Sequence, residues 1–162
     1  MKVISGGQTG VDQAALRAAE ACGLEIGGWC PPGHESEDGP IPERYPLRET
    51  PVERSPDAPD VPRSLRTEWN VRDSDAVLVL KAPSAQPLDP GSAWAEACAR
   101  RYGKPLLVCD PADPDAESRI VEWLRATAVA TLSVGGPSER TLPGVGDAAY
   151  SLLVRVFRRL AT

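Results

Sequence analysis

Residues 2–16 read KVISGGQTGVDQAAL, which predicts a short buried strand, a glycine-rich turn and the start of a helix. One stripe of that helix carries mostly small residues, so it can pack very close to a sheet; the members are Val11, Ala14, Ala15, Ala18, Ala19 and Cys22. Glycines at such a turn let backbone N–H groups approach an anion, and they serve equally well as a tight corner. Taken alone, the turn leaves both interpretations open.

Further apolar runs of strand length alternate with helix-like stretches along the chain. The strand candidates are residues 76–81, 106–109 and 129–134, with a weaker one at 24–28, and the helix candidates lie at about 91–102, 120–124 and 149–160. Continuous apolar runs are typical of strands buried on both faces. The alternation predicts one α/β domain over residues 1–162, a three-layer Rossmann-like sandwich with a mostly parallel sheet.

A long segment, residues 29–62, interrupts this pattern and holds nine of the 17 prolines without a helical or strand period. Loops of this length in compact domains are usually functional or disordered. We expect an ordered excursion over the ligand face, because Trp29, Ile41, Tyr45 and Leu47 offer apolar anchors. A solvated proline-rich loop is the alternative.

The composition limits the classes of function. The chain has 18 Lys and Arg against 23 Asp and Glu, a formal charge of −5 and a pI near 5.0, which argues against general nucleic-acid binding. No apolar run has the length of a membrane span, and no basic segment followed by a long apolar one marks a signal peptide. We therefore expect a cytoplasmic protein that binds neither nucleic acid nor membrane.

The four cysteines, Cys22, Cys30, Cys98 and Cys109, form no C-x-x-C pair, and we expect them to be small buried hydrophobes. A zinc site built from Cys22, Cys30 and His34 is a weaker alternative, since a second compact ligand pair is missing. His34 is the only histidine. A Ser-His-Asp or Cys-His mechanism would thus have to use a loop residue, so no catalytic group is assigned.

Three glycine-bearing segments follow predicted strands and would meet at the carboxyl edge of the sheet. They are the opening turn at residues 5–10, residues 91–96 after an expected loop at 81–90, and the pair Gly135 and Gly136. Because residues 91–96 open a helix, Ser92 is either an extra donor to an anion or an ordinary N-cap. This convergence is the strongest sign of a ligand site that the residues themselves give.

Two groups of polar residues accompany these turns. Asp12, in the first helical turn, either complements the helix dipole or contacts a ribose or a bound cation. Arg66, Thr67 and Asn70 share one face of a predicted helix at spacings of three and four residues. They form either a polar grip on a ligand or a solvated helix face.

Five stretches resemble, in order, the putative molybdenum carrier family, also described as the circularly permuted YpsA-like branch of the SLOG superfamily. They are SGGQTGVDQAAL, GGWCPPGHESEDGPIPERYPLRET, RTEWNVRDSDAVLVL, GSAWAEACARRYGKPLLV and LSVGGPSERTLPGV. The resemblance covers almost the whole chain. It implies a circularly permuted, Rossmann-like sandwich of SLOG type that binds nucleotides or nucleotide-derived ligands at its glycine loops. The chain departs from the family pattern at Pro32, His34, Ala95 and Arg140.

We therefore expect binding of a small anionic, nucleotide-like ligand, with molybdenum-cofactor carriage as one form of that function, and a homo-oligomer. The residues expected to bind the ligand are Ser5, Gly6, Gly7, Gln8, Thr9, Gly10, Asp12, Arg66, Thr67, Asn70, Gly91, Ser92, Glu96 and Gly136. The main alternative is a hydrolase of the N-glycosidic bond of a nucleotide or ADP-ribose-like compound, with Glu96 or Asp12 as acid or base. A domain that only binds protein partners is a third possibility.

Overall fold

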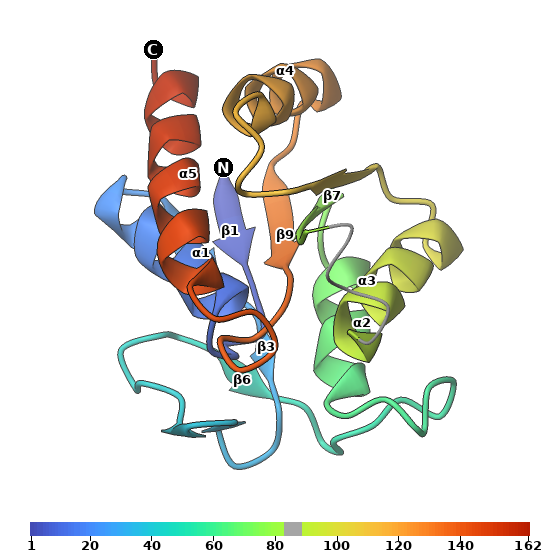
Figure 1. The fold of residues 1–162 in the computed structure, drawn as a ribbon. Helices are drawn as coiled ribbons and strands as arrows, with labels where there is room; N and C mark the ends of the chain where they lie inside the picture. The colour runs from blue at the N-terminus through green and yellow to red at the C-terminus, as the bar shows by residue number, and fades with distance from the viewer. Residues whose placement is uncertain (83–88) are drawn as a thin grey trace.

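The computed structural model describes residues 1–82 and 89–162, and its centre is a five-stranded sheet. The strands are β1 (Lys2–Ile4), β2 (Glu25–Gly27), β7 (Ala76–Leu80), β8 (Leu106–Cys109) and β9 (Thr131–Gly135). They lie in the order β2-β1-β9-β7-β8, and each pairing is parallel (Figure 1). The expected parallel sheet is confirmed, and the weak candidate at 24–28 is its edge strand. Residues 83–88, within the stretch 81–90 that the sequence predicts to be a loop, lie outside the described residues.

Helices cover both faces of the sheet and complete three layers. The helices α1 (Val11–Ala21), α4 (Ala116–Thr127) and α5 (Val145–Leu160) share one apolar core with β1 and β9. On the other face, α2 (Ser64–Arg72) and α3 (Pro90–Arg101) pack beside β7 (Figure 1). The four alanines of the small-residue stripe, Ala14, Ala15, Ala18 and Ala19, are fully buried as the stripe predicts, and α1 lies close against α5.

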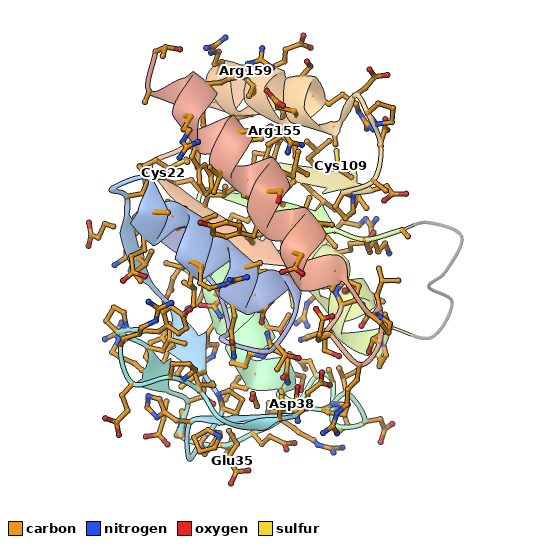
Figure 2. The ribbon with its side chains drawn as sticks, turned by 60° about the vertical axis from the view of Figure 1, so that its left-hand side comes forward. Cys22, Glu35, Asp38, Cys109, Arg155 and Arg159 are labelled. Carbon is orange, nitrogen blue, oxygen red and sulfur yellow. The ribbon has the colours of Figure 1, made fainter. Side chains whose placement is uncertain are left out.

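The helices α4 and α5 begin earlier than their apolar spacing predicts, because their first turns are polar or lack bulky residues. In α5 the Glu139 carboxylate accepts hydrogen bonds from the amides of Gly144 (2.6 Å) and Gly146 (3.0 Å), which fixes its start. On the outer side, Arg155 and Arg159 of α5 pair with Glu117 of α4 at 2.9 and 3.2 Å (Figure 2). These exposed pairs tie the two helices together at little gain in stability.

Residues 29–62 contain short strands that the sequence did not predict. β3 (Trp29–Cys30) pairs with β6 (Arg48–Glu49), and β4 (Glu35–Ser36) pairs with β5 (Gly39–Pro40). Two-residue strands are too short to show a period, so the expectation of no strand here was wrong. Three of the expected anchors, Ile41, Tyr45 and Leu47, are buried in a small core with Cys30 and Leu16 of α1, whereas Trp29 is only partly buried.

Within the described parts of the chain, no helix combines the length and the apolar character that crossing a membrane requires.

Candidate functional site

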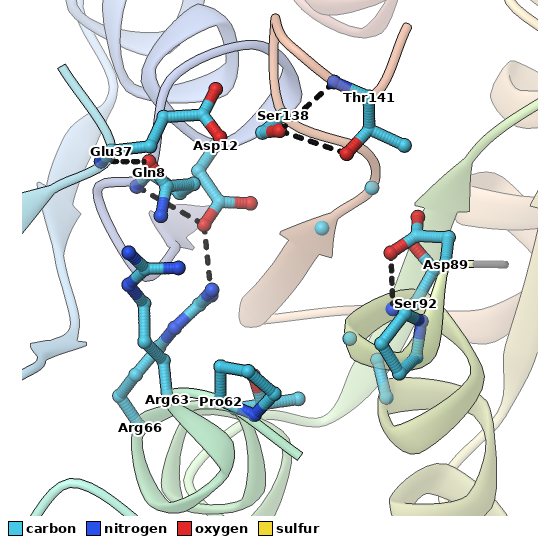
Figure 3. Close-up of a pocket in the computed structure, with 16 residues that line it drawn as sticks. Gln8, Asp12, Glu37, Pro62, Arg63, Arg66, Asp89, Ser92, Ser138 and Thr141 are labelled. Atoms are coloured by element: carbon cyan, nitrogen blue, oxygen red, sulfur yellow. Dashed lines mark hydrogen bonds and ion pairs between the residues drawn. The ribbon is translucent and has the colours of Figure 1, made fainter.

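A pocket lies at the carboxyl edge of the sheet, where α1, α2 and α3 begin and β9 ends (Figure 3). Seven of the predicted ligand residues line it: Gln8, Asp12, Arg66, Thr67, Gly91, Ser92 and Gly136. They come from all three glycine-bearing segments and from the polar face of α2. The structure thus brings together the three glycine-bearing segments at the carboxyl edge of the sheet, where they were expected to meet.

An ion pair between Asp12 and Arg66 forms one wall of this pocket. Arg66 Nη1 donates to Asp12 Oδ2 at 2.9 Å, and the backbone N–H of Gln8 donates to the same oxygen at 3.3 Å. Asp12 is only 2% exposed. Burial raises the pKa of its carboxyl group, although Arg66 and the Gln8 amide act in the opposite direction. The other carboxylate oxygen points toward the centre of the pocket (Figure 3).

Arg66 has hydrogen-bonding capacity that the described residues do not use. Its Nε is buried and has no hydrogen-bond partner among the described residues. Buried N–H groups are nearly always paired in folded proteins, so this one is informative. Gly6 explains how the guanidinium reaches this place, because a Cβ on Gly6 would clash with Arg66 Nη1. The glycine at position 6 therefore leaves room for the side chain of Arg66 rather than for a phosphate.

The opening turn itself behaves mostly as a corner. The amide of Thr9 donates to its neighbour Gln8 Oε1 at 3.0 Å, and the amide of Val11 donates to the carbonyl of Pro137 at 3.2 Å. Gly7 and Gly10 both have φ of +79°, which glycine adopts without strain. A Cβ on Gly7 would meet Leu47 and Ile41, and one on Gly10 would meet the backbone of residues 137–139. Protein acceptors thus take the amides of Gln8, Thr9 and Val11, whereas binding of an anion by the glycine amides of this turn stays a prediction.

Four other predicted residues have structural partners and do not line the pocket. Ser5 Oγ donates to the Val134 carbonyl at 2.6 Å, and Thr9 Oγ1 donates to Glu37 Oε1 at 2.5 Å. Glu96 pairs with Lys81 at 2.5 Å. The Asn70 side chain accepts from the Trp29 amide at 2.8 Å and donates to the Trp29 carbonyl at 3.0 Å. Asn70 thus anchors the start of the 29–62 segment, which differs from the polar grip predicted for it.

The residues considered for a zinc site lie in different surroundings. Cys30 is buried in the small core of the 29–62 segment, where burial first and Glu49 second raise the pKa of its thiol to about 11. His34 Nδ1 lies 3.2 Å from Glu49 Oε2, and Cys22 lies against the carbonyl of Val154 in α5. Among residues 1–82 and 89–162, no three His, Cys, Asp or Glu side chains are grouped to hold a metal ion. The zinc interpretation has no support in this arrangement.

The comparisons with known proteins show the family of the chain. Residues 3–157 match the model of the Circularly permutated YpsA SLOG family. The chain belongs to this family. It is also similar to the crystal structure of the Putative molybdenum carrier protein from Syntrophus aciditrophicus SB, with 37% identity, coverage of 96% of this chain and 93% of that one, and a TM-score of 0.83. A search of curated proteins found no match.

Sequence reasoning missed several residues that line the pocket of this SLOG protein. Arg63 precedes α2 with φ of +58°, and no sequence pattern marks it. Asp89 caps α3 by accepting from the Ser92 amide at 3.3 Å and from the Ser92 hydroxyl. The sequence did hold a signal for it, since Asp before Pro at a helix start is a typical cap. Glu37 arrives from the proline-rich segment, 28 residues from its partner Thr9.

Proposed function

We propose that this SLOG protein binds a small nucleotide-like ligand whose anionic group lies against Arg63 and Arg66. Arg66 is the observation that carries the proposal. Its Nη1 is held by the buried Asp12, while its Nε is buried with no acceptor among the described residues. Arg63 lies beside it on the same wall of the pocket (Figure 3). Guanidinium groups bind phosphate and carboxylate oxygens through paired hydrogen bonds, so an oxyanion would satisfy both.

The carriage of a molybdenum compound is one form of this function. It is supported by the similarity to the Syntrophus protein, which is named Putative molybdenum carrier protein. Molybdate and the phosphate of a molybdenum cofactor are both oxyanions, and two arginines suit either of them. The pocket residues have no feature that favours molybdate over phosphate, so the cargo is tested as one member of a panel.

Hydrolysis of a nucleotide is the second candidate, and Asp12 is the observation that favours it. A buried carboxyl group with a raised pKa, facing a pocket, is suited to act as a general acid. Glu96, the other carboxylate considered, pairs with Lys81 and does not line the pocket. Incubation with nucleoside monophosphates, followed by chromatography for released base, tests this role; Asp12→Asn should then abolish release, whereas a binding protein releases none.

Calorimetric titration of the full chain tests the binding proposal. The probes are adenosine and guanosine monophosphates, ribose 5-phosphate and molybdate. Because hydrogen bonds to charged groups contribute more than neutral ones, we expect Arg66→Met to weaken binding of the tightest probe about tenfold or more. Arg63→Met should act in the same direction without leaving Asp12 unpaired.

Arg72→Met is the matched control, since Arg72 is exposed at the other end of α2 and pairs with Asp73. Its affinity should equal that of the unmodified protein, and thermal unfolding of every variant confirms that it is folded. The proposal is wrong if no probe binds, or if both pocket arginines can be replaced without loss of affinity.

A further inference from the structure

We infer that the ligand of this pocket carries one compact anionic group and presents hydroxyl or amine donors to a carboxylate wall. The inference rests on the proposed function and narrows it to a class of ligand. It follows from the charges around the pocket, which has two guanidinium groups, Arg63 and Arg66, and three carboxylates, Asp12, Glu37 and Asp89. The walls are thus not broadly cationic, as a site for several phosphates would be.

Two of the three carboxylates lie at the starts of helices that face the pocket. At α1, Asp12 accepts the Gln8 amide, and at α3, Asp89 accepts both the amide and the hydroxyl of Ser92. A helix N-terminus binds phosphate through free amides and the positive end of its dipole. Asp89 takes the Ser92 amide at α3 and Asp12 lies in the first turn of α1, so a second or third phosphate would meet negative charge at both places. Among the residues that line the pocket, Arg63 and Arg66 are the cationic ones, so the anion lies against them.

Asp12 supplies the acceptor for the neutral part of the ligand. It is 2% exposed, and the hydrogen bonds from Arg66 and from the Gln8 amide both end on Oδ2. Its Oδ1 faces Gly135, since a Cβ built there would lie 3.9 Å from it. The two glycines, Gly135 and Gly136, leave room beside this oxygen for a ligand to approach. A carboxylate oxygen that faces a pocket accepts hydrogen bonds well from a hydroxyl or an amine.

A monophosphorylated sugar has this chemistry, whether it is free or part of a nucleotide. The anion lies at Arg63 and Arg66, and vicinal hydroxyls reach Asp12 Oδ1. Free sugar phosphates and nucleoside monophosphates share both groups, so the test must contain both. Comparison of each with its deoxy analogue isolates the contribution of the hydroxyls.

Calorimetric titration at constant ionic strength, with EDTA to remove divalent cations, provides the test. The probes are adenosine mono-, di- and triphosphate, 2′-deoxyadenosine monophosphate, ribose 5-phosphate and 2-deoxyribose 5-phosphate. We expect the monophosphate to bind about tenfold or more tightly than the triphosphate, against the order of their charges. Each deoxy compound should bind more weakly than its hydroxylated partner. Equal affinity of the sugar phosphate and the nucleotide would identify the sugar phosphate as the bound part.

Two isosteric variants separate the two halves of the inference. Asp89→Asn removes charge while keeping a good N-cap, so it should raise the affinity for the triphosphate relative to the monophosphate about tenfold. Asp12→Asn should reduce the difference between hydroxylated and deoxy probes. Asp147→Asn is the control, because Asp147 also lies in a first helical turn but is exposed on α5, outside the pocket.

Affinity that rises with the number of phosphates in the unmodified protein would overturn the inference while leaving the proposed function standing. Deoxy probes that bind as well as their partners would do the same. If none of the probes binds at all, both the inference and the proposed function fail.

Discussion

Glu37 shows how a single side chain joins parts of the chain that are far apart in sequence. Its Oε1 accepts from Thr9 Oγ1 at 2.5 Å and from the Arg140 amide at 3.0 Å, while its own amide donates to Gln8 Oε1 at 2.9 Å. The neighbouring Asp38 pairs with Arg140 at 2.8 Å. One residue of the 29–62 segment therefore holds the turn after β1 against the turn after β9. Nothing near Glu37 in the sequence marks it, because all of its partners lie on other segments.

These hydrogen bonds predict an acid-sensitive contribution to stability. Burial acts to raise the pKa of Glu37, but the hydrogen bonds from Thr9 and the Arg140 amide outweigh it, so the pKa lies below its ordinary value of 4.5. A lowered folded-state pKa stabilises the protein above 4.5, and this contribution is lost as the pH falls through the folded value. We therefore expect the free energy of unfolding, measured by urea titration, to fall less in the Glu37→Gln variant than in the unmodified protein when the pH is lowered through that range.

Glu35→Gln is the control for that prediction, since Glu35 is exposed on β4 in the same segment. Its acid profile should follow that of the unmodified protein. Identical acid profiles for Glu37→Gln and the unmodified protein would contradict the assigned role.

At the scale of elements, α2 shows where sequence reasoning succeeds and where it stops. The spacing correctly places Arg66 and Asn70 on one helical face. The first turn of that face meets the pocket, whereas the next turn meets β3, so one residue lines the site and the other holds Trp29. Helical spacing fixes which side chains point the same way, but what covers each turn depends on segments elsewhere in the chain. The same limit applies after β1, where the amide of Val11 donates to the carbonyl of Pro137, a residue that lies far away in the sequence.

Loss of the two hydrogen bonds between the Asn70 side chain and the Trp29 backbone should destabilise the protein, and it changes no residue that lines the pocket. Asn70 is 3% exposed and makes two hydrogen bonds to the Trp29 backbone. Asn70→Ala leaves a backbone donor and acceptor unpaired, so we expect a loss of about 1–3 kcal/mol in urea unfolding. Asn70→Asp keeps the acceptor for the Trp29 amide and loses the donor, and it serves as the comparison. An unchanged free energy of unfolding in Asn70→Ala would show that these two hydrogen bonds do not contribute to stability.

At the scale of the whole molecule, the alternation of strands and helices was enough to predict the layers, the parallel sheet and the edge where the pocket lies. The order β2-β1-β9-β7-β8 was not accessible from local patterns, because it joins the first strand of the chain to the last. That pairing places β1, with its glycine turn, near the centre of the sheet. The turn therefore opens onto the same edge as the ends of β7 and β9. The homo-oligomer expected from the sequence stays a prediction.

The four free cysteines lie in different parts of the fold, so the reactivity of each thiol shows whether its part of the protein is folded. Cys30 is buried within the 29–62 segment, and Cys98 is on the buried side of α3. Cys109 ends β8, while Cys22 follows α1 and is only half-buried (Figure 2). Burial raises the pKa of Cys98 to about 12 and that of Cys30 to about 11, and it also raises the pKa of Cys109. Because the thiolate is the reactive form, these three thiols should be inert in the native protein.

We therefore expect a chromogenic disulfide reagent at about pH 8 to modify one thiol quickly, Cys22, and the other three only as the protein unfolds. Denaturant should expose all four at once. In Cys22→Ser the fast phase should vanish while the slow phase is unchanged, which assigns the fast phase to that residue. The rate of the slow phase then measures how fast the protein unfolds and exposes the three buried thiols. Two or more fast thiols in the native protein would mean that the 29–62 segment or α3 opens independently of the sheet, contrary to the packing described above.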